Sequence, residues 1–138
     1  MRDLGLGLWG PGYPQGPVFG DEFVRVFAGA DIALNIHQFF DDPPDYTRYG
    51  HGGNRRVFEL SGIGTPQLCD AKEDVKRVFR DGEEIVLFRS PAELRDKAMG
   101  LLADPERRAS IGAAARRRML AAHTWLPRLE QLLTGALR

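Results

Sequence analysis

The chain is poor in cysteine and lysine and has no long hydrophobic run. Cys69 is the one cysteine among 138 residues, which excludes an internal disulfide and a zinc site built from several thiolates. No stretch of about 18 apolar residues is present, so we expect no membrane span. The 19 basic residues balance 19 acidic ones, and zero net charge argues against nucleic acid as the partner. We therefore expect a cytoplasmic protein.

The rest of the composition is that of an ordinary globular domain, with 43% hydrophobic and 28% charged residues. Short apolar segments typical of buried strands alternate with amphipathic segments typical of helices. We expect strands at residues 4–9, 32–36, 67–69 and 84–88, and helices at about 21–27, 55–61, 73–79, 91–103, 105–122 and 125–133. This alternation predicts one α/β domain over residues 1–138, a Rossmann-like three-layer arrangement with a parallel sheet of about four strands and a helical C-terminal end.

Three of these helices begin at residues that are good N-caps. Ser90 and Asp104 each precede a proline, and Asn54 follows two glycines. The side-chain oxygen of such a residue accepts a hydrogen bond from an N–H of the first helical turn. We expect all three to fix the start of a helix, and we expect Asp21 to cap the short helix at about residues 21–27.

The passage from Gly52 to Glu59 is the first candidate site, because it leads from a loop with glycines into a helix. Free N–H groups at a helix start attract phosphate, and Arg55 or Arg56 can add a bidentate contact to a diphosphate. The carboxylate of Glu59 can accept hydrogen bonds from ribose hydroxyls. The alternative is structural: Asn54 caps the helix, the arginines are solvated, and Glu59 pairs with one of them.

Asn35 and His37 form the second candidate, at the carboxyl end of a predicted buried strand. In open α/β sheets ligands bind just beyond these ends. A neutral histidine there can donate a hydrogen bond to a sugar hydroxyl or a phosphate. Equally, a loop carbonyl can satisfy the ring, and the sequence leaves both interpretations open.

Three other groups of residues give weaker signals. A set of possible metal ligands lies in one proline-broken stretch, where a solvated acidic loop is favoured over a metal site: His37, Asp41, Asp42, Asp45 and His51. Arg116–Arg118, with Arg107 and Arg108, spread around a helix instead of forming the single stripe that nucleic acid requires. Cys69 ends a short strand, where a small buried apolar role is favoured over a nucleophile.

Several segments of the chain, taken in order, are similar to one known family. They are Ile32–His37, Asn54-x-Arg56-x-Phe58-Glu59, Gly62-x-Gly64-Thr65-Pro66, Phe79-x-x-Gly82-Glu83-Glu84, Ser90–Leu94, Leu102-x-Asp104-Pro105-x-x-Arg108 and His123-Thr124-Trp125-x-x-Arg128. This order resembles the glycosyltransferase-like domain of CgeB-type spore maturation proteins, which is of the GT-B kind. The resemblance covers about residues 18–134.

The resemblance implies the donor-binding, C-terminal half of a two-domain glycosyltransferase that transfers a hexose from a nucleotide-sugar. Glu59 matches the glutamate that hydrogen-bonds the ribose, and Asn54 and Arg56 match the helix start beside the diphosphate. Together the segments imply one set of substrate-binding residues: Asn35, His37, Asn54, Arg56, Glu59, Gly62, Gly64 and Thr65. The donor is a substrate, and no metal or other cofactor is expected.

The chain also departs from the family pattern. His51 stands where many retaining relatives have a second glutamate, so no catalytic residue is assigned. The acceptor-binding domain and the first strand-helix unit of the donor domain have no counterpart in the sequence, which predicts truncation at the N-terminal edge. A missing or separate domain would then bring the acceptor, and an exposed sheet edge would favour a homodimer.

Two other functional classes stay open. One is a non-catalytic binding or assembly module that descends from a glycosyltransferase and keeps its fold. The other is a different Rossmann-like nucleotide binder, suggested by fold alone. The sugar, the nucleotide base, the acceptor and the stereochemistry of transfer do not follow from the residues.

Overall fold

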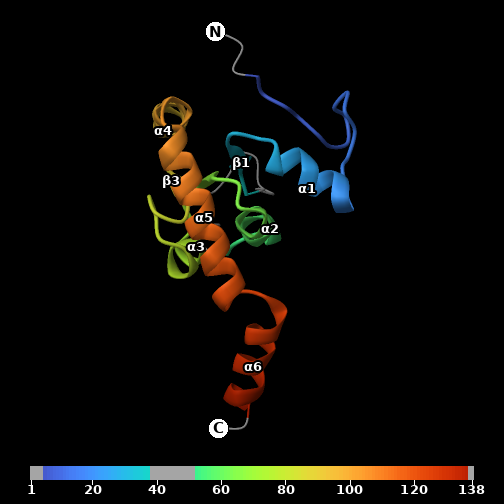
Figure 1. Ribbon diagram of the computed structural model, residues 1–138, viewed down its shortest axis with the longest axis vertical. Coiled ribbons are helices and arrows are strands. Elements are labelled where there is room, and N and C mark those ends of the chain that lie inside the picture. Colours follow the sequence, from blue (N-terminus) through green and yellow to red (C-terminus); the bar gives the residue numbers. More distant parts are fainter. Residues whose placement is uncertain (1–4, 38–51, 137–138) are drawn as a thin grey trace, which may run out of the picture.

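The computed structural model describes residues 5–37 and 52–136 of the chain (Figure 1). These residues form three strands and six helices, in this order: α1 (Gly20–Ala28), β1 (Ala33–Asn35), α2 (Arg55–Ile63), β2 (Gln67–Asp70), α3 (Glu73–Val78), β3 (Val86–Phe88), α4 (Pro91–Ala103), α5 (Pro105–Ala122) and α6 (Trp125–Ala136). The alternation of strands and helices predicted from the sequence is confirmed.

The strands form one parallel sheet in the order β1-β2-β3. Leu34 of β1 is in register with Leu68 of β2, and Leu68 is in register with Val86 of β3. Parallel neighbours require a crossover connection, and α2 and α3 supply the two crossovers. The fold is therefore an α/β Rossmann-like arrangement, as the sequence predicts.

Helices cover both faces of the sheet, so the domain has three layers. On one face, Cys69 and Leu87 join a core of buried side chains from α2 and α3 and the segments that follow: Val57, Val75, Phe79 and Ile85. On the other face, Leu68, Val86 and Phe88 pack against Leu101 of α4 and Ile111 of α5. Successive residues of each strand thus serve opposite cores, as the pleat of a strand requires.

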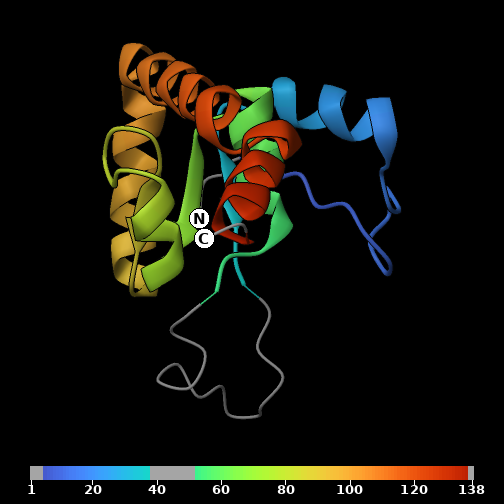
Figure 2. The same cartoon turned by 90° about the horizontal axis from the view of Figure 1, so that it is seen from below.

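The edge strand β1 is only partly covered. Leu34 is 42% exposed and Ile36 is 55% exposed, whereas Ala33 and Asn35 are buried. Figure 2 shows α4 near the β3 side of the sheet and α1 on the β1 side. Because α4 packs against β2 and β3, the face of β1 that carries Leu34 stays open.

The structure corrects the number of strands. Residues 5–9, expected to form most of a first strand, have no strand partner, and the described sheet has three strands instead of about four. Gly5 and Gly7 lower the tendency of this segment to form a strand. Leu6 is 69% exposed, so burial of its side chain does not stabilise pairing with the sheet. α1 also begins at Gly20, before the expected cap Asp21, and its N-cap Phe19 makes no side-chain cap bond.

The three predicted N-caps are confirmed. Asn54 accepts the N–H of Val57 at 3.2 Å, Ser90 accepts that of Glu93, and Asp104 accepts that of Arg107 at 2.9 Å. Each bond satisfies an N–H group that the helix itself leaves without a partner. These local contacts fix where α2, α4 and α5 begin.

Two glycines bring α2 and α5 together. Gly64 ends α2 in the left-handed conformation, with φ of 90°, which costs little without a Cβ. A Cβ on Gly112 of α5 would lie 2.1 Å from the carbonyl oxygen of Gly64. The two helices can therefore be this close only because position 112 has no side chain.

α6 extends from the end of α5, away from the sheet (Figure 1). Its large apolar residues are exposed, with Trp125 reaching 84%: Trp125, Leu126, Leu129, Leu132 and Leu133. Within residues 5–37 and 52–136, no helix combines the length and the apolar character needed to cross a membrane.

Candidate functional site

An open hollow of about 400 Å³ lies where β1 ends and α2 begins. It is lined by residues from both elements: Leu34, Asn35, Ile36, Asn54, Arg55, Arg56 and Glu59. This is the carboxyl end of a parallel strand, the place where open α/β sheets bind ligands. The structure thus brings four of the predicted binding residues to one surface: Asn35, Asn54, Arg56 and Glu59.

Asn35 and Asn54 are joined by two amide hydrogen bonds. The Nδ2 of Asn54 donates to the Oδ1 of Asn35 at 2.9 Å, and the Nδ2 of Asn35 donates back to the Oδ1 of Asn54 at 3.1 Å. Asn35 is only 2% exposed, so its amide depends on protein partners. The pair ties the end of the strand directly to the cap of the helix.

A buried polar chain continues from this pair beneath α2. The Nδ2 of Asn35 also contacts the Oε1 of Gln67 at 3.4 Å, and Gln67 donates to Ser61 Oγ and to the carbonyl of Val57. Gln67 and Ser61 are both buried. Because the amide hydrogens of Gln67 reach acceptors on α2, the chain fixes α2 against the sheet without leaving these groups unpaired.

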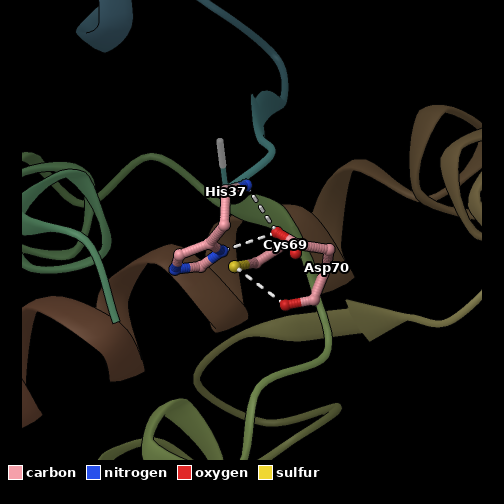
Figure 3. A group of neighbouring side chains, drawn as sticks. All are labelled: His37, Cys69 and Asp70. Carbon is pink, nitrogen blue, oxygen red and sulfur yellow. Dashed lines mark hydrogen bonds and ion pairs between the residues drawn. The ribbon is translucent and has the colours of Figure 1, made fainter. Parts of the chain in front are cut away.

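His37 is held by Asp70 (Figure 3) and by the backbone of Asn54. The N–H of Asn54 donates to Nε2 at 3.0 Å, which requires Nε2 to carry no proton. Nδ1, 2.6 Å from the Oδ1 of Asp70, then carries the ring proton and donates it to the carboxylate. The backbone N–H of His37 donates to the same oxygen at 2.9 Å.

Both ring nitrogens of His37 therefore have protein partners. The sequence left open whether a ligand or the protein would satisfy this ring, and in the structure the protein does. The partners are a carboxylate and a backbone N–H, instead of the loop carbonyl that one of the two interpretations named. A direct bond from His37 to a ligand would have to replace one of them.

The carboxylate of Asp70 also faces a buried cation. The Nζ of Lys72 lies 3.4 Å from Oδ2 of Asp70, and Lys72 is 4% exposed. Burial would by itself raise the pKa of Asp70, but the hydrogen bonds from His37 and the charge of Lys72 lower the pKa below its ordinary value. Asp70 is thus an ionised carboxylate at neutral pH.

His37, Cys69 and Asp70 lie close enough to be considered as metal ligands (Figure 3). Burial, followed by the charge of Asp70, raises the pKa of Cys69 to about 12, so the sulfur is a neutral thiol. A cation at this point would also face the ammonium of Lys72. The contacts are those of a hydrogen-bonded cluster, and the high thiol pKa argues equally against Cys69 as a nucleophile.

The two arginines at the helix start have weak partners. The Nε of Arg55 lies 2.8 Å from the Oε1 of Glu59, and the guanidinium of Arg56 lies 5.7 Å from the ring centre of Phe23 on α1. Arg55 is 88% exposed, and such ion pairs contribute only about 0–1 kcal/mol. The pairing of Glu59 with an arginine is one of the two interpretations that the sequence left open.

Three predicted binding residues lie at the other end of α2, outside the lining of the hollow. The carbonyl of Gly62 accepts a hydrogen bond from the guanidinium of Arg116, and Gly64 is the left-handed C-cap of α2. The hydroxyl of Thr65 donates to the carbonyl of Phe27 at 2.7 Å, which ties α1 to the end of α2. The contacts described for these residues are structural, and their role in binding stays a prediction.

The remaining candidates separate into two groups. Asp41, Asp42, Asp45 and His51 lie outside the described residues. Two of the three consecutive arginines of α5 have partners within the protein: Arg116 donates to the carbonyl of Gly62, and Arg118 donates to the carbonyl of Val78 at 3.1 Å. Arg116 and Arg118 therefore hold α5 against its neighbours.

Sequence reasoning missed Asp70, Lys72 and Gln67, which complete the site. Asp70 is the last residue of β2, next to the end of β1 in the sheet, so its place at the strand ends was a usable signal. The sequence did not predict the burial of Lys72, because a charged residue at the start of a helix is usually exposed to solvent. Gln67 begins an apolar strand, and its burial depends on partners in α2 that are distant in sequence.

The arrangement leaves donors at the first turn of α2. Among the contacts of the described residues, the N–H groups of Arg55 and Arg56 have no acceptor, as is usual for the first two residues of a helix. They stand beside the hollow with two guanidinium groups and one carboxylate. Such a site can bind an anionic group and, through Glu59, a hydroxyl group.

A family model described as glycosyl transferase-like matches residues 1–134. The chain belongs to the glycosyl transferase-like family. The match extends over the sheet, the hollow and nearly all of α6, and it assigns the fold a role in glycosyl transfer. A search of the curated proteins gave no match.

Proposed function

We propose that this glycosyl transferase-like domain is the donor-binding half of a glycosyltransferase, and that it holds a nucleotide-sugar in the hollow between β1 and α2. The observation that carries the proposal is the first turn of α2. Its unpaired N–H groups, Arg55, Arg56 and Glu59 converge on one open surface at the carboxyl end of a parallel strand. That combination suits a diphosphate joined to a sugar.

The diphosphate would lie against the amides of Arg55 and Arg56, with the guanidinium groups neutralising its charge as the glycosidic bond breaks. Glu59 would accept the ribose hydroxyls. For this, Arg55 must turn from the carboxylate toward the phosphate, and the exposed ion pair costs at most about 1 kcal/mol to open. The contact of Arg56 with Phe23 is comparably weak, about 0.5–1 kcal/mol.

We infer that transfer of a hexose requires an acceptor supplied by a further domain, either covalently linked or separate. The CgeB-like subfamily is our proposal for this chain within the broader family. The mechanism is one of positioning and charge neutralisation, and it uses no metal or other cofactor. No side chain is proposed as a catalytic acid, base or nucleophile.

Calorimetry with UDP-glucose and GDP-mannose tests this function. We expect one of the two to bind, and Arg56→Gln and Glu59→Gln each to weaken binding by about 5- to 30-fold. Arg117→Gln is the matched control, because Arg117 is an exposed arginine of α5 that does not line the hollow. Failure of both probes to bind at millimolar concentration, with all variants folded, would contradict the proposal.

The exposed face of α6 favours a second candidate, a non-catalytic assembly module. Its large apolar side chains contact water in this chain, and monomeric proteins rarely expose contiguous apolar patches of this kind. The open edge of β1 offers a second place where two copies could pair. Light scattering separates the candidates: a stable dimer without nucleotide-sugar binding supports assembly, and a monomer that binds the donor supports the enzyme.

A further inference from the structure

We propose that His37 is a pH-sensitive positioning residue, whose neutral ring accepts the backbone N–H of Asn54 and thereby holds the first turn of α2 ready for an anionic ligand. The expected effect of His37 on ligand affinity rests on the proposed function. The expected effect of His37 on the start of α2 rests only on the contacts of its ring. The ring is 9% exposed and sits between the ends of β1 and β2 and the start of α2.

The tautomer of His37 follows from the geometry. A backbone N–H can only donate, so the 3.0 Å contact from Asn54 makes Nε2 the acceptor. Nδ1 then bears the proton, and its partner at 2.6 Å is the ionised Asp70. Asp70 selects the tautomer that the helix start requires, in the way that a carboxylate orients an imidazole in many functional sites.

The hydrogen bond from Asn54 to His37 matters because Asn54 directly precedes the amides of α2 that are proposed to bind the anion. Asn54 is at once the N-cap of α2, the partner of Asn35 and the residue before Arg55. The bond fixes the N–H of the peptide between Gly53 and Asn54, directly before the free amides of Arg55 and Arg56. The ring of His37 therefore helps to orient the backbone that leads into these amides without touching a ligand at the hollow.

Protonation would remove the acceptor. An imidazolium carries a hydrogen on each nitrogen, so Nε2–H would point at the N–H of Asn54 over 3.0 Å. Nδ1–H would still donate to the carboxylate of Asp70, so the ring would stay in place. The N–H of Asn54, and with it the start of α2, would have to move away from Nε2–H. Among the described residues, Asp70 and Cys69 of β2 lie beside the ring, Lys72 lies beside Asp70, and Asp74 of α3 accepts the N–H of Gly52.

Two variants separate the bonds of the ring. His37→Gln places an amide oxygen near the position of Nε2 and keeps an acceptor for Asn54, without a group that titrates. His37→Asn places an amide nitrogen near Nδ1, so it keeps the donor to Asp70 and loses the acceptor. The two changes are similar in polarity, and thermal unfolding checks that each variant folds.

The first measurement is NMR on the isotope-labelled 138-residue chain. Imidazole nitrogen spectra of the wild type at pH 8 should show the Nδ1–H tautomer of His37. As the pH is lowered until the imidazole nitrogen shifts report a charged His37, the Asn54 amide should lose protection from exchange in step with His37. An Nε2–H tautomer, or an Asn54 amide that does not respond, overturns the proposal even if His37→Asn fails to fold.

The second measurement is binding of UDP-glucose or GDP-mannose, whose doubly esterified diphosphate keeps its charge over this range. We expect wild-type affinity to fall roughly three- to tenfold between the pH values at which NMR shows a neutral and a charged His37. His37→Gln should abolish most of this change, and His37→Asn should bind weakly at both values. Equal pH dependence in the wild type and His37→Gln overturns the coupling to binding. If neither probe binds but the Asn54 amide follows His37, the proposed function fails and the positioning role of His37 stands.

Discussion

The side chains of Asn35 and Asn54 exchange two hydrogen bonds, and in doing so they join the end of β1 to the first turn of α2. Asn54 has a further task, because its Oδ1 also accepts the N–H of Val57. One amide thus serves as helix cap and as the link to the strand. The position of the hollow depends on both tasks, since β1 and α2 form its two sides.

Replacing Asn54 tests this double task. We expect Asn54→Ala to destabilise the fold by about 2–4 kcal/mol, since it removes a cap worth about 1 kcal/mol and leaves the buried Oδ1 of Asn35 without the donor that Asn54 supplies. Ser90→Ala is the matched control, because Ser90 caps α4 and has no second side-chain partner among the contacts described. Urea unfolding measures both. Equal losses would show that the link to Asn35 contributes nothing.

The contact between α2 and α5 gives a second prediction. Gly112→Ala places a Cβ against the carbonyl oxygen of Gly64, and a backbone atom cannot rotate away, so we expect a loss of about 1–3 kcal/mol. Gly100→Ala is the control, because Gly100 lies in α4 with open space around it. There the change should stabilise by up to about 1 kcal/mol. Thermal unfolding of the two variants should therefore shift in opposite directions.

Cys69 should be unreactive in the folded protein. Its side chain is buried, and burial raises the pKa of the thiol to about 12, so very little thiolate exists at pH 8. We expect a chromogenic disulfide reagent to modify the native chain very slowly and the chain in guanidinium within seconds to minutes. Rapid modification under native conditions would mean that β2 opens or that Cys69 is more exposed than described here.

His123 should make the fold sensitive to acid. It lies between the rings of Phe58 and Phe79, with centroids 5.7 and 5.4 Å away. Burial, followed by the charge of Arg128, lowers the pKa of His123 below the ordinary value of 6.5. The unfolded chain therefore binds this proton more readily, so stability is complete above about pH 6.5 and declines as the pH falls below it.

His123→Gln checks the cause of that decline, because glutamine does not titrate. We expect the difference in unfolding free energy between wild type and variant to shrink from pH 8 to pH 5. Chemical denaturation at several pH values between these limits measures the slope. A constant difference would assign the acid sensitivity to other groups.

The sequence predicted the parts of the fold that depend on neighbouring residues. The caps at Asn54, Ser90 and Asp104 follow from local backbone chemistry and are all present. The expected strand at residues 4–9 failed because a strand exists only if another pairs with it, and pairing is not a local property.

The site was predicted in its position and only partly in its contacts. Strand ends and a helix start pointed correctly to one surface shared by Asn35, Asn54 and Glu59. The bonds of His37 to Asp70 and Asn54 join residues that are 33 and 17 positions apart, so no local spacing pattern in the sequence predicts these bonds. The role of Thr65 likewise depends on Phe27 of a different helix.

The close approach of Gly112 to Gly64 has a consequence for motion at the opposite end of α2. Since backbone lies against backbone there, that end of α2 has little room to move toward α5. The first turn, 9 residues away at the other end, is held by side-chain hydrogen bonds, which can lengthen or bend. Any shift of α2 on binding an anion should therefore be larger at its first turn than at Gly64.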